Sequence, residues 1–170
     1  MYRTSYKTLF SLTIVVLIIV LIVVYIGKPE RVSNRFAQNL FNYPLPAETT
    51  LLEKKQYNGR NWVGGGSGGY WSVIAYIKLN TKLSQREIVR YYKLAGEFPY
   101  PDPDNNIRGV QPEIYFEDNR KLIEASEGTY YLTERGSHQA VETIDKMDQE
   151  GAANEVIVQI VSGFKYFQID

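Results

Sequence analysis

The chain has 170 residues, with 19 basic and 19 acidic side chains and no cysteine. The lack of cysteine excludes disulfides, thiol catalysis and lipid attachment at a cysteine within these residues. No run of basic and aromatic residues indicates a nucleic-acid-binding module. His138 is the single histidine, and we expect no cofactor.

One apolar stretch dominates the N-terminal part. Residues 9–26 hold no charge, glycine or proline, and as a helix they cover roughly 27 Å, close to the roughly 30 Å of a bilayer core. We therefore expect a transmembrane helix. A cleaved signal peptide is the alternative, but the bulky residues up to Ile26 and the lack of an Ala-x-Ala pattern favour a retained anchor.

The short segment before this span suggests its orientation. Two basic side chains precede the span and three follow it closely, so positive charge alone does not decide. A head of this length resembles that of a signal anchor. We expect a cytoplasmic head at residues 1–8, a juxtamembrane stalk at 27–46 and an extracytoplasmic domain at 47–170, in a single-pass protein of the cell membrane.

The stalk should contain a short helix at residues 29–41. Val32, Phe36 and Leu40 recur at helical spacing and form one apolar stripe. Such a helix either lies on the membrane surface or packs on its own domain, and a stripe this small favours the second. The prolines of residues 42–46 then force extended chain into the folded domain.

The strand pattern is clearest at residues 70–80. Apolar residues alternate there, so one face should point into a core, and the other is aromatic enough to be partly covered as well. Asn58–Gly59 is expected to turn the chain, and Ser162–Gly163 to turn or bulge it. Further strands are expected at residues 48–57, 113–118, 121–125, 129–134, 155–161 and 164–169.

The best-specified helix should run from Gln85 to Ala95. Ser84 and Glu87 have the spacing of a capping box, and Gly96 is a stop signal. The side chains expected to face the sheet are Ile88, Tyr91, Tyr92 and Ala95. The other side carries a basic stripe of Arg86, Arg90 and Lys93. Such a stripe is either a solvated face or a contact for an anion.

The expected fold class is α+β. Strands that follow one another without intervening helices imply antiparallel pairing, so we expect one mostly antiparallel sheet of about five to six strands. One or two helices should pack on this sheet, and residues 139–149 are the candidate for the second. The N-terminal transmembrane helix precedes this domain.

The glycine-rich loop at residues 64–69 contains a serine in the pattern Gly-x-Ser-x-Gly. Asp102 and His138 follow Ser67 in the order of a catalytic triad. This pattern requires a helix after the serine, whereas a strand is expected here, so we do not assign catalysis to it. A small cell-envelope hydrolase that uses Ser67 or a carboxylate pair is the alternative function.

Four residues have the spacing of a calcium-binding loop: Asp102, Asp104, Asn106 and Glu113. Ile107 occupies the position at which such loops need glycine, and no helix is expected on either side. We therefore expect a polar, turn-rich loop and assign no metal site.

Charge is distributed unevenly along the chain. Residues 27–96 carry 11 basic and 4 acidic groups, whereas residues 97–170 carry 6 basic and 15 acidic groups. If the two halves interleave in one sheet, these charges form ordinary surface salt bridges. If they segregate, one pole of the domain is basic and the other acidic, and partners of both signs become possible.

Several features together resemble a group of uncharacterised single-pass membrane proteins of Gram-positive bacteria. These features are Tyr43–Pro–Leu–Pro46 with Thr49, the glycine-rich loop, and the helix with Leu83–Ser84 and Tyr91–Tyr92. The resemblance covers most of residues 43–95 and implies no activity.

The leading hypothesis is a membrane-anchored, extracytoplasmic and non-catalytic binding module. Its partners would be the bilayer, through residues 9–26, and a protein or an envelope polymer. No nucleic acid is expected, and the sequence does not indicate the oligomeric state. The residues expected to contact a ligand or partner are Trp62, Ser67, Tyr70, Arg86, Arg90 and Lys93.

Overall fold

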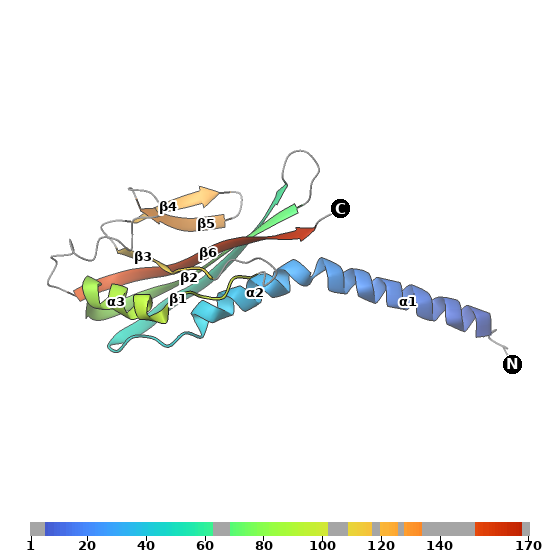
Figure 1. The fold of residues 1–170 in the computed structure, drawn as a ribbon, viewed down its shortest axis with the longest axis horizontal. Coiled ribbons are helices and arrows are strands. Elements are labelled where there is room, and N and C mark those ends of the chain that lie inside the picture. The colour runs from blue at the N-terminus through green and yellow to red at the C-terminus, as the bar shows by residue number, and fades with distance from the viewer. Residues whose placement is uncertain are drawn as a thin grey trace.

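The computed structural model describes residues 6–62, 69–101, 109–116, 120–125, 128–133 and 152–167. Helices and an antiparallel sheet occupy these ranges, which confirms the α+β class (Figure 1). The elements are α1 (Tyr6–Ile26), α2 (Lys28–Phe41), β1 (Thr49–Trp62), β2 (Gly69–Ser84), α3 (Gln85–Ala95), β3 (Glu113–Phe116), β4 (Arg120–Ala125), β5 (Gly128–Thr133) and β6 (Ala152–Phe167). The helix expected at residues 139–149 lies outside the described residues.

α1 is an apolar helix that extends away from the sheet (Figure 1). None of the 18 residues Leu9–Ile26 is buried in the structure. Their length and composition are sufficient for the helix to cross a membrane.

α2 follows α1 with only Gly27 between them. The Gly27 N–H donates to the Val23 carbonyl at 3.0 Å, and the Arg31 N–H donates to the Gly27 carbonyl at 3.2 Å. A Cβ atom at position 27 would lie 2.8 Å from the Arg31 guanidinium, which also donates to the Val24 carbonyl. Two backbone hydrogen bonds therefore cross the junction, where the helix changes direction (Figure 1).

α2 packs its apolar stripe on the sheet. Phe36, Ala37 and Leu40 are completely or almost completely buried and belong to the main core. The buried Ser33 hydroxyl accepts a hydrogen bond from the Trp71 indole N–H at 2.8 Å. The structure thus favours a helix packed on its own domain over one that lies on the membrane surface.

The sheet has the strand order β1–β2–β6–β3, and every neighbouring pair is antiparallel. β4 and β5 pair with each other as a separate hairpin. The expectation of five to six strands in one sheet is therefore not confirmed among the described residues. The reason is that β5 lies close to β1 and β3 without pairing with either, so that the hairpin adds a second layer.

Both faces of the sheet contain buried residues. The face under α2 and α3 contributes the odd-numbered residues of β2 to the core, from Val73 to Leu79, as the alternation predicts. Tyr76, Tyr115 and Ile157 form a smaller buried cluster on the opposite face. The prediction that this second face is partly covered is confirmed.

The expected turn at Asn58–Gly59 is wrong, because both residues lie within β1. Asn58 pairs with Val73 and Gly59 pairs with Ser72. The Asn58 amide donates to the Glu30 carboxylate of α2 at 2.7 Å. This asparagine therefore makes a tertiary contact with α2 and does not form a turn, and the strand continues to Trp62.

The expected break at Ser162–Gly163 is also wrong, since β6 is one strand of 16 residues. A Cβ atom at Gly163 would lie 2.4 Å from the Tyr70 ring. The Gly163 carbonyl accepts a hydrogen bond from the Tyr100 hydroxyl. Glycine is needed here for the close approach of an aromatic ring, and not for a turn.

Candidate functional site

The start of α3 is fixed by the capping box that the sequence predicts. The Ser84 hydroxyl accepts from the Glu87 N–H at 3.3 Å, and the Glu87 carboxylate accepts from the Ser84 N–H at 2.8 Å. This backbone hydrogen bond, with a further one from the Ser84 hydroxyl, lowers the pKa of Glu87. α3 therefore begins at Gln85 and ends before Gly96, whose φ of 72° suits glycine.

The two sides of α3 differ almost as predicted. Ile88 and Tyr92 are buried, as expected, but Tyr91 and Ala95 are only half-buried, and Val89 takes a core position instead. The solvent side carries the basic face, which we define as Arg86, Arg90 and Lys93, all exposed. Leu94 is 81% exposed beside them. No acidic group in the described part of the chain forms an ion pair with this face.

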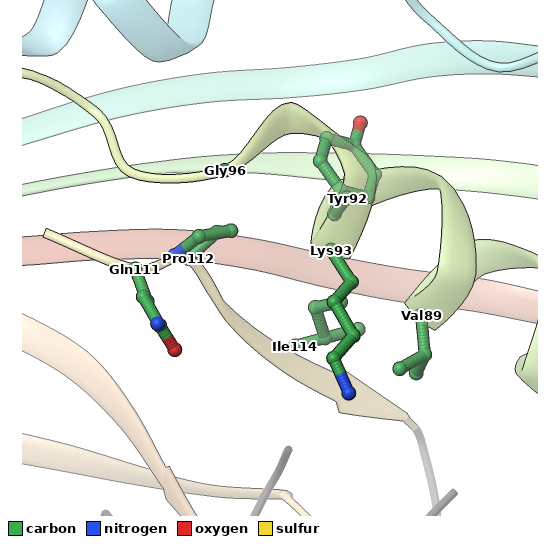
Figure 2. A pocket seen from close by; sticks show the side chains of 7 residues that line it. All are labelled: Val89, Tyr92, Lys93, Gly96, Gln111, Pro112 and Ile114. Atoms are coloured by element: carbon green, nitrogen blue, oxygen red, sulfur yellow. The ribbon is translucent and has the colours of Figure 1, made fainter.

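A small pocket of about 130 Å³ lies between α3 and the segment that leads into β3 (Figure 2). It is lined by Val89, Tyr92, Lys93, Gly96, Gln111, Pro112 and Ile114. Figure 2 shows the Lys93 and Gln111 side chains extending in the same direction, with Lys93 in front of Ile114 in this view. Typical small-molecule pockets measure about 300–1,000 Å³. This one is large enough for a single side chain of a partner.

An aromatic cluster holds α3 to the entry segment of the domain. Tyr43 makes edge or tilted ring contacts with Tyr91, Tyr92 and Phe98, at centroid distances of 5.6–6.0 Å. The Tyr91 hydroxyl donates to the Pro44 carbonyl at 2.9 Å. The buried Tyr92 hydroxyl has no hydrogen-bond partner in the described structure. Burial raises the pKa of both Tyr91 and Tyr92, with a smaller contribution from neighbouring tyrosines.

The other predicted contact residues lie at the opposite end of β2. Trp62 is the last residue of β1 and pairs with Gly69. Tyr70 follows in β2 and is 38% exposed. Ser67 lies outside the described residues. The 14 steps of strand from Tyr70 to Ser84 span roughly 45 Å, so Tyr70 and the basic face of α3 cannot form one site.

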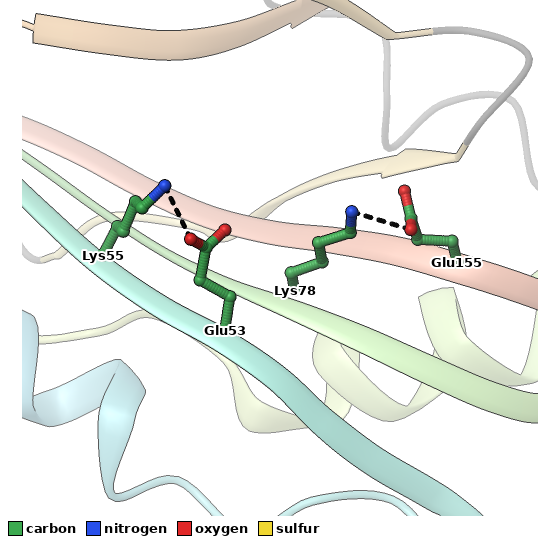
Figure 3. Close-up of polar contacts among 4 residues, drawn as sticks. All are labelled: Glu53, Lys55, Lys78 and Glu155. Carbon is green, nitrogen blue, oxygen red and sulfur yellow. Dashed lines mark ion pairs between the residues drawn. The ribbon is translucent and has the colours of Figure 1, made fainter.

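Charged groups on the second face of the sheet pair with one another (Figure 3). Lys55 lies 2.6 Å from Glu53, and Lys78 lies 2.7 Å from Glu155. The second pair joins the basic and acidic halves of the chain, so part of the charge asymmetry is neutralised within the sheet. Partly exposed pairs of this kind stabilise a fold only slightly. The basic face of α3 takes no part in this pairing.

Glu113, the last residue of the calcium-like spacing, lies in β3. Its carboxylate accepts hydrogen bonds from the Tyr115 hydroxyl and, at 3.2 Å, from the Gln159 amide. Asp102, Asp104 and Asn106 lie outside the described residues, as does His138. Within the described ranges, no three acidic or histidine side chains are grouped as metal ligands.

Comparisons with protein-family models, with curated proteins and with solved structures found no match. The resemblance of residues 43–95 to single-pass proteins of Gram-positive bacteria therefore stays a prediction. The class that the fold defines is an α+β domain joined to an N-terminal helix long enough to span a membrane.

Sequence reasoning missed two residues near the basic face of α3, which are Leu94 and Gln111. Leu94 lies four residues after Arg90, which is the helical spacing that places both on one side, so this spacing could have identified it. Gln111 reaches the pocket from a loop that the sequence leaves unplaced relative to α3. The bridge between Phe98 and Val110 brings that loop back beside the helix.

Proposed function

We propose that this protein is a membrane-anchored, non-catalytic binding module that presents α3 to an anionic partner. The observation that carries the proposal is the basic face of α3, with three exposed cationic side chains beside the exposed Leu94. Cations held in fixed positions on a short helix favour a partner with repeated negative charges. An anionic envelope polymer has this chemistry, and the apolar contact at Leu94 would add to the electrostatic attraction.

The connection between the domain and the candidate span supports this proposal. A protein that only needed a tether would be served by a flexible linker. Here, α2 leads from the candidate span directly into the core, and β1 holds α2 through side-chain hydrogen bonds. Because α3 packs at the opposite end of the sheet from the α1–α2 junction (Figure 1), the basic face is held away from the bilayer.

We propose further that the domain lies outside the cytoplasm. The short head before the span, which is typical of signal anchors, supports this orientation. Protease added to intact cells should then digest the domain from residue 47 onward. Digestion only after permeabilisation would reverse the orientation.

The partner can be tested with full-length protein in lipid nanodiscs and inorganic polyphosphate as a model anionic polymer. Three exposed ion pairs of about 0.5 kcal/mol each correspond to roughly a tenfold change in affinity. The triple variant R86Q/R90Q/K93Q should therefore bind roughly ten times more weakly. Binding of the wild type should also weaken with added salt, because exposed charges are screened.

Arg35→Gln provides the matched control for Arg90→Gln. Both residues are exposed arginines on helices, and each variant loses one positive charge. R90Q should weaken polyphosphate binding and R35Q should not. Equal loss in both would show that net charge, and not α3, governs binding, and unchanged binding of the triple variant would overturn the proposal.

The non-catalytic part of the proposal concerns Ser67. It predicts that a fluorophosphonate probe, which reacts with activated serines, leaves Ser67 unlabelled. Covalent labelling at Ser67 would favour the hydrolase alternative.

A further inference from the structure

α2 and β1 are aligned by three polar contacts. The Asn58 amide donates to the Glu30 carboxylate at 2.7 Å, and the Gln56 amide donates to the Asn34 side-chain oxygen at 2.9 Å. The Lys54 ammonium donates to the Phe41 carbonyl at 2.6 Å. As the residue number rises along the helix, it falls along the strand. β1 therefore runs back along α2, toward the end of the candidate span.

The spacing of these contacts gives a length scale. Between the outer contacts, β1 advances four residues, or about 13 Å at roughly 3.3 Å per residue. α2 advances eleven residues, or about 16 Å at 1.5 Å per residue. The two lengths nearly agree, so helix and strand are close to antiparallel.

The same scale locates the end of the sheet. From Asn58 to Trp62, β1 continues about 13 Å beyond the first contact. From Glu30 back to Ile26, the helix continues only about 6 Å. Measured along α2, the sheet end thus reaches past the end of the apolar span. Figure 1 shows the ends of β1, β2 and β6 on the side of the α1–α2 junction, where the helix changes direction.

The residues at this end suit a membrane interface. Tyr70 is exposed and packs over Gly163, and Lys165 is exposed close to it in β6. Trp62 and Phe167 are the last residues of their strands. Tryptophan and tyrosine are enriched where proteins meet lipid headgroups, and lysine extends its ammonium to the same level.

We propose that this end of the sheet is a second membrane contact, which rests in the headgroup region of the bilayer that α1 crosses. The inference rests on the proposed membrane anchoring. It adds that the domain lies against the lipid surface in one orientation, with the ends of β1, β2 and β6 on the lipid and α3 directed away from it.

The chain contains its own probes, because its two tryptophans, Trp62 and Trp71, both lie at this end. Full-length protein is reconstituted in phosphatidylcholine vesicles, with and without lipids brominated near the headgroup. Bromine quenches tryptophan only at short range. The wild-type emission should be clearly lower in the brominated vesicles, without any substitution being needed. Equal emission in the two kinds of vesicle would overturn the inference.

Two variants make the test specific for position. W71F leaves Trp62 as the single tryptophan, and its emission should still be quenched in the brominated vesicles. In the W62F/W71F background, L94W places the single tryptophan on α3, at the other end of the sheet, and should show none. If L94W is quenched as strongly as Trp62, the domain has no fixed orientation on the lipid, and the inference is wrong.

Flotation of the same vesicles after alkaline carbonate treatment separates this inference from the anchoring on which it rests. Protein that fails to float contradicts the membrane anchor itself. Protein that floats without quenching retains the anchor and contradicts only the second contact.

Discussion

Replacing Tyr92 with phenylalanine should make the protein more stable. The Tyr92 side chain is fully buried, and its hydroxyl has no partner among the described residues. A buried hydroxyl left without a hydrogen bond costs about 1–3 kcal/mol. Because phenylalanine keeps the ring and its packing, Y92F should raise the free energy of unfolding by about 1 kcal/mol or more. In a domain of this size, that gain corresponds to a Tm increase of roughly 3–5 °C.

The neighbouring tyrosine supplies a control with the opposite sign. The Tyr91 hydroxyl donates to the Pro44 carbonyl, so Y91F removes a hydrogen bond and should lower stability by about 0.5–1.5 kcal/mol. The chemical change is identical at the two positions. Only the presence of a partner differs.

Urea unfolding of the full-length protein in detergent micelles, followed by circular dichroism, measures both variants. The midpoints should move in opposite directions at constant m-value. The raised pKa of Tyr92 adds a second signature. Above the usual value of 10.0 the unfolded chain loses the Tyr92 proton more readily than the folded protein, so the stability of the wild type falls as pH rises. The advantage of Y92F should therefore grow above pH 10. If Y92F destabilises as much as Y91F, the Tyr92 hydroxyl has a partner and the reasoning fails.

Three further substitutions test local features of the fold. S84A removes the capping oxygen and should cost about 1 kcal/mol at constant m-value, and an unchanged urea midpoint would mean that the cap does not hold α3. The lowered pKa of Glu87 stabilises the fold above its ordinary value of 4.5, so the stability difference between wild type and E87Q should shrink as pH falls below 4.5. A difference that is independent of pH would contradict the pKa shift. G163A should cost about 1 kcal/mol because its Cβ would displace the Tyr70 ring. This cost should disappear in a Y70A background, and an equal cost in both would show that the ring is not responsible.

Local sequence signals predicted the helices well. The limits of α3 match the prediction because the capping box and Gly96 act within a few residues of the helix ends. The apolar stripe of α2 was recognisable for the same reason. The odd-numbered face of β2 followed from strict alternation, which needs no knowledge of the partner strands.

The errors arose where a distant residue decides the local conformation. Taken by itself, Asn58 favours a turn, but its hydrogen bond to Glu30 of α2 holds it in a strand. Gly163 would favour a break, but the Tyr70 ring occupies the space above it. The separation of β4 and β5 from the main sheet likewise depends on tertiary packing.

The candidate site was predicted in composition but not in arrangement. The basic face of α3 followed directly from helical spacing. The strand expected at residues 70–80 already lies between Tyr70 and α3, so a single site that contains both was not consistent with the predicted elements. β2 places the two groups of residues at opposite ends of the domain.

The short junction at Gly27 has a mechanical consequence. Because two backbone hydrogen bonds cross it and α2 is packed into the core, no flexible linker separates the domain from α1. Any rotation of α1 about its own axis turns the whole domain with it. If α1 spans a membrane, as proposed, a neighbouring helix that bound one side of α1 would set the direction in which α3 points across the membrane surface.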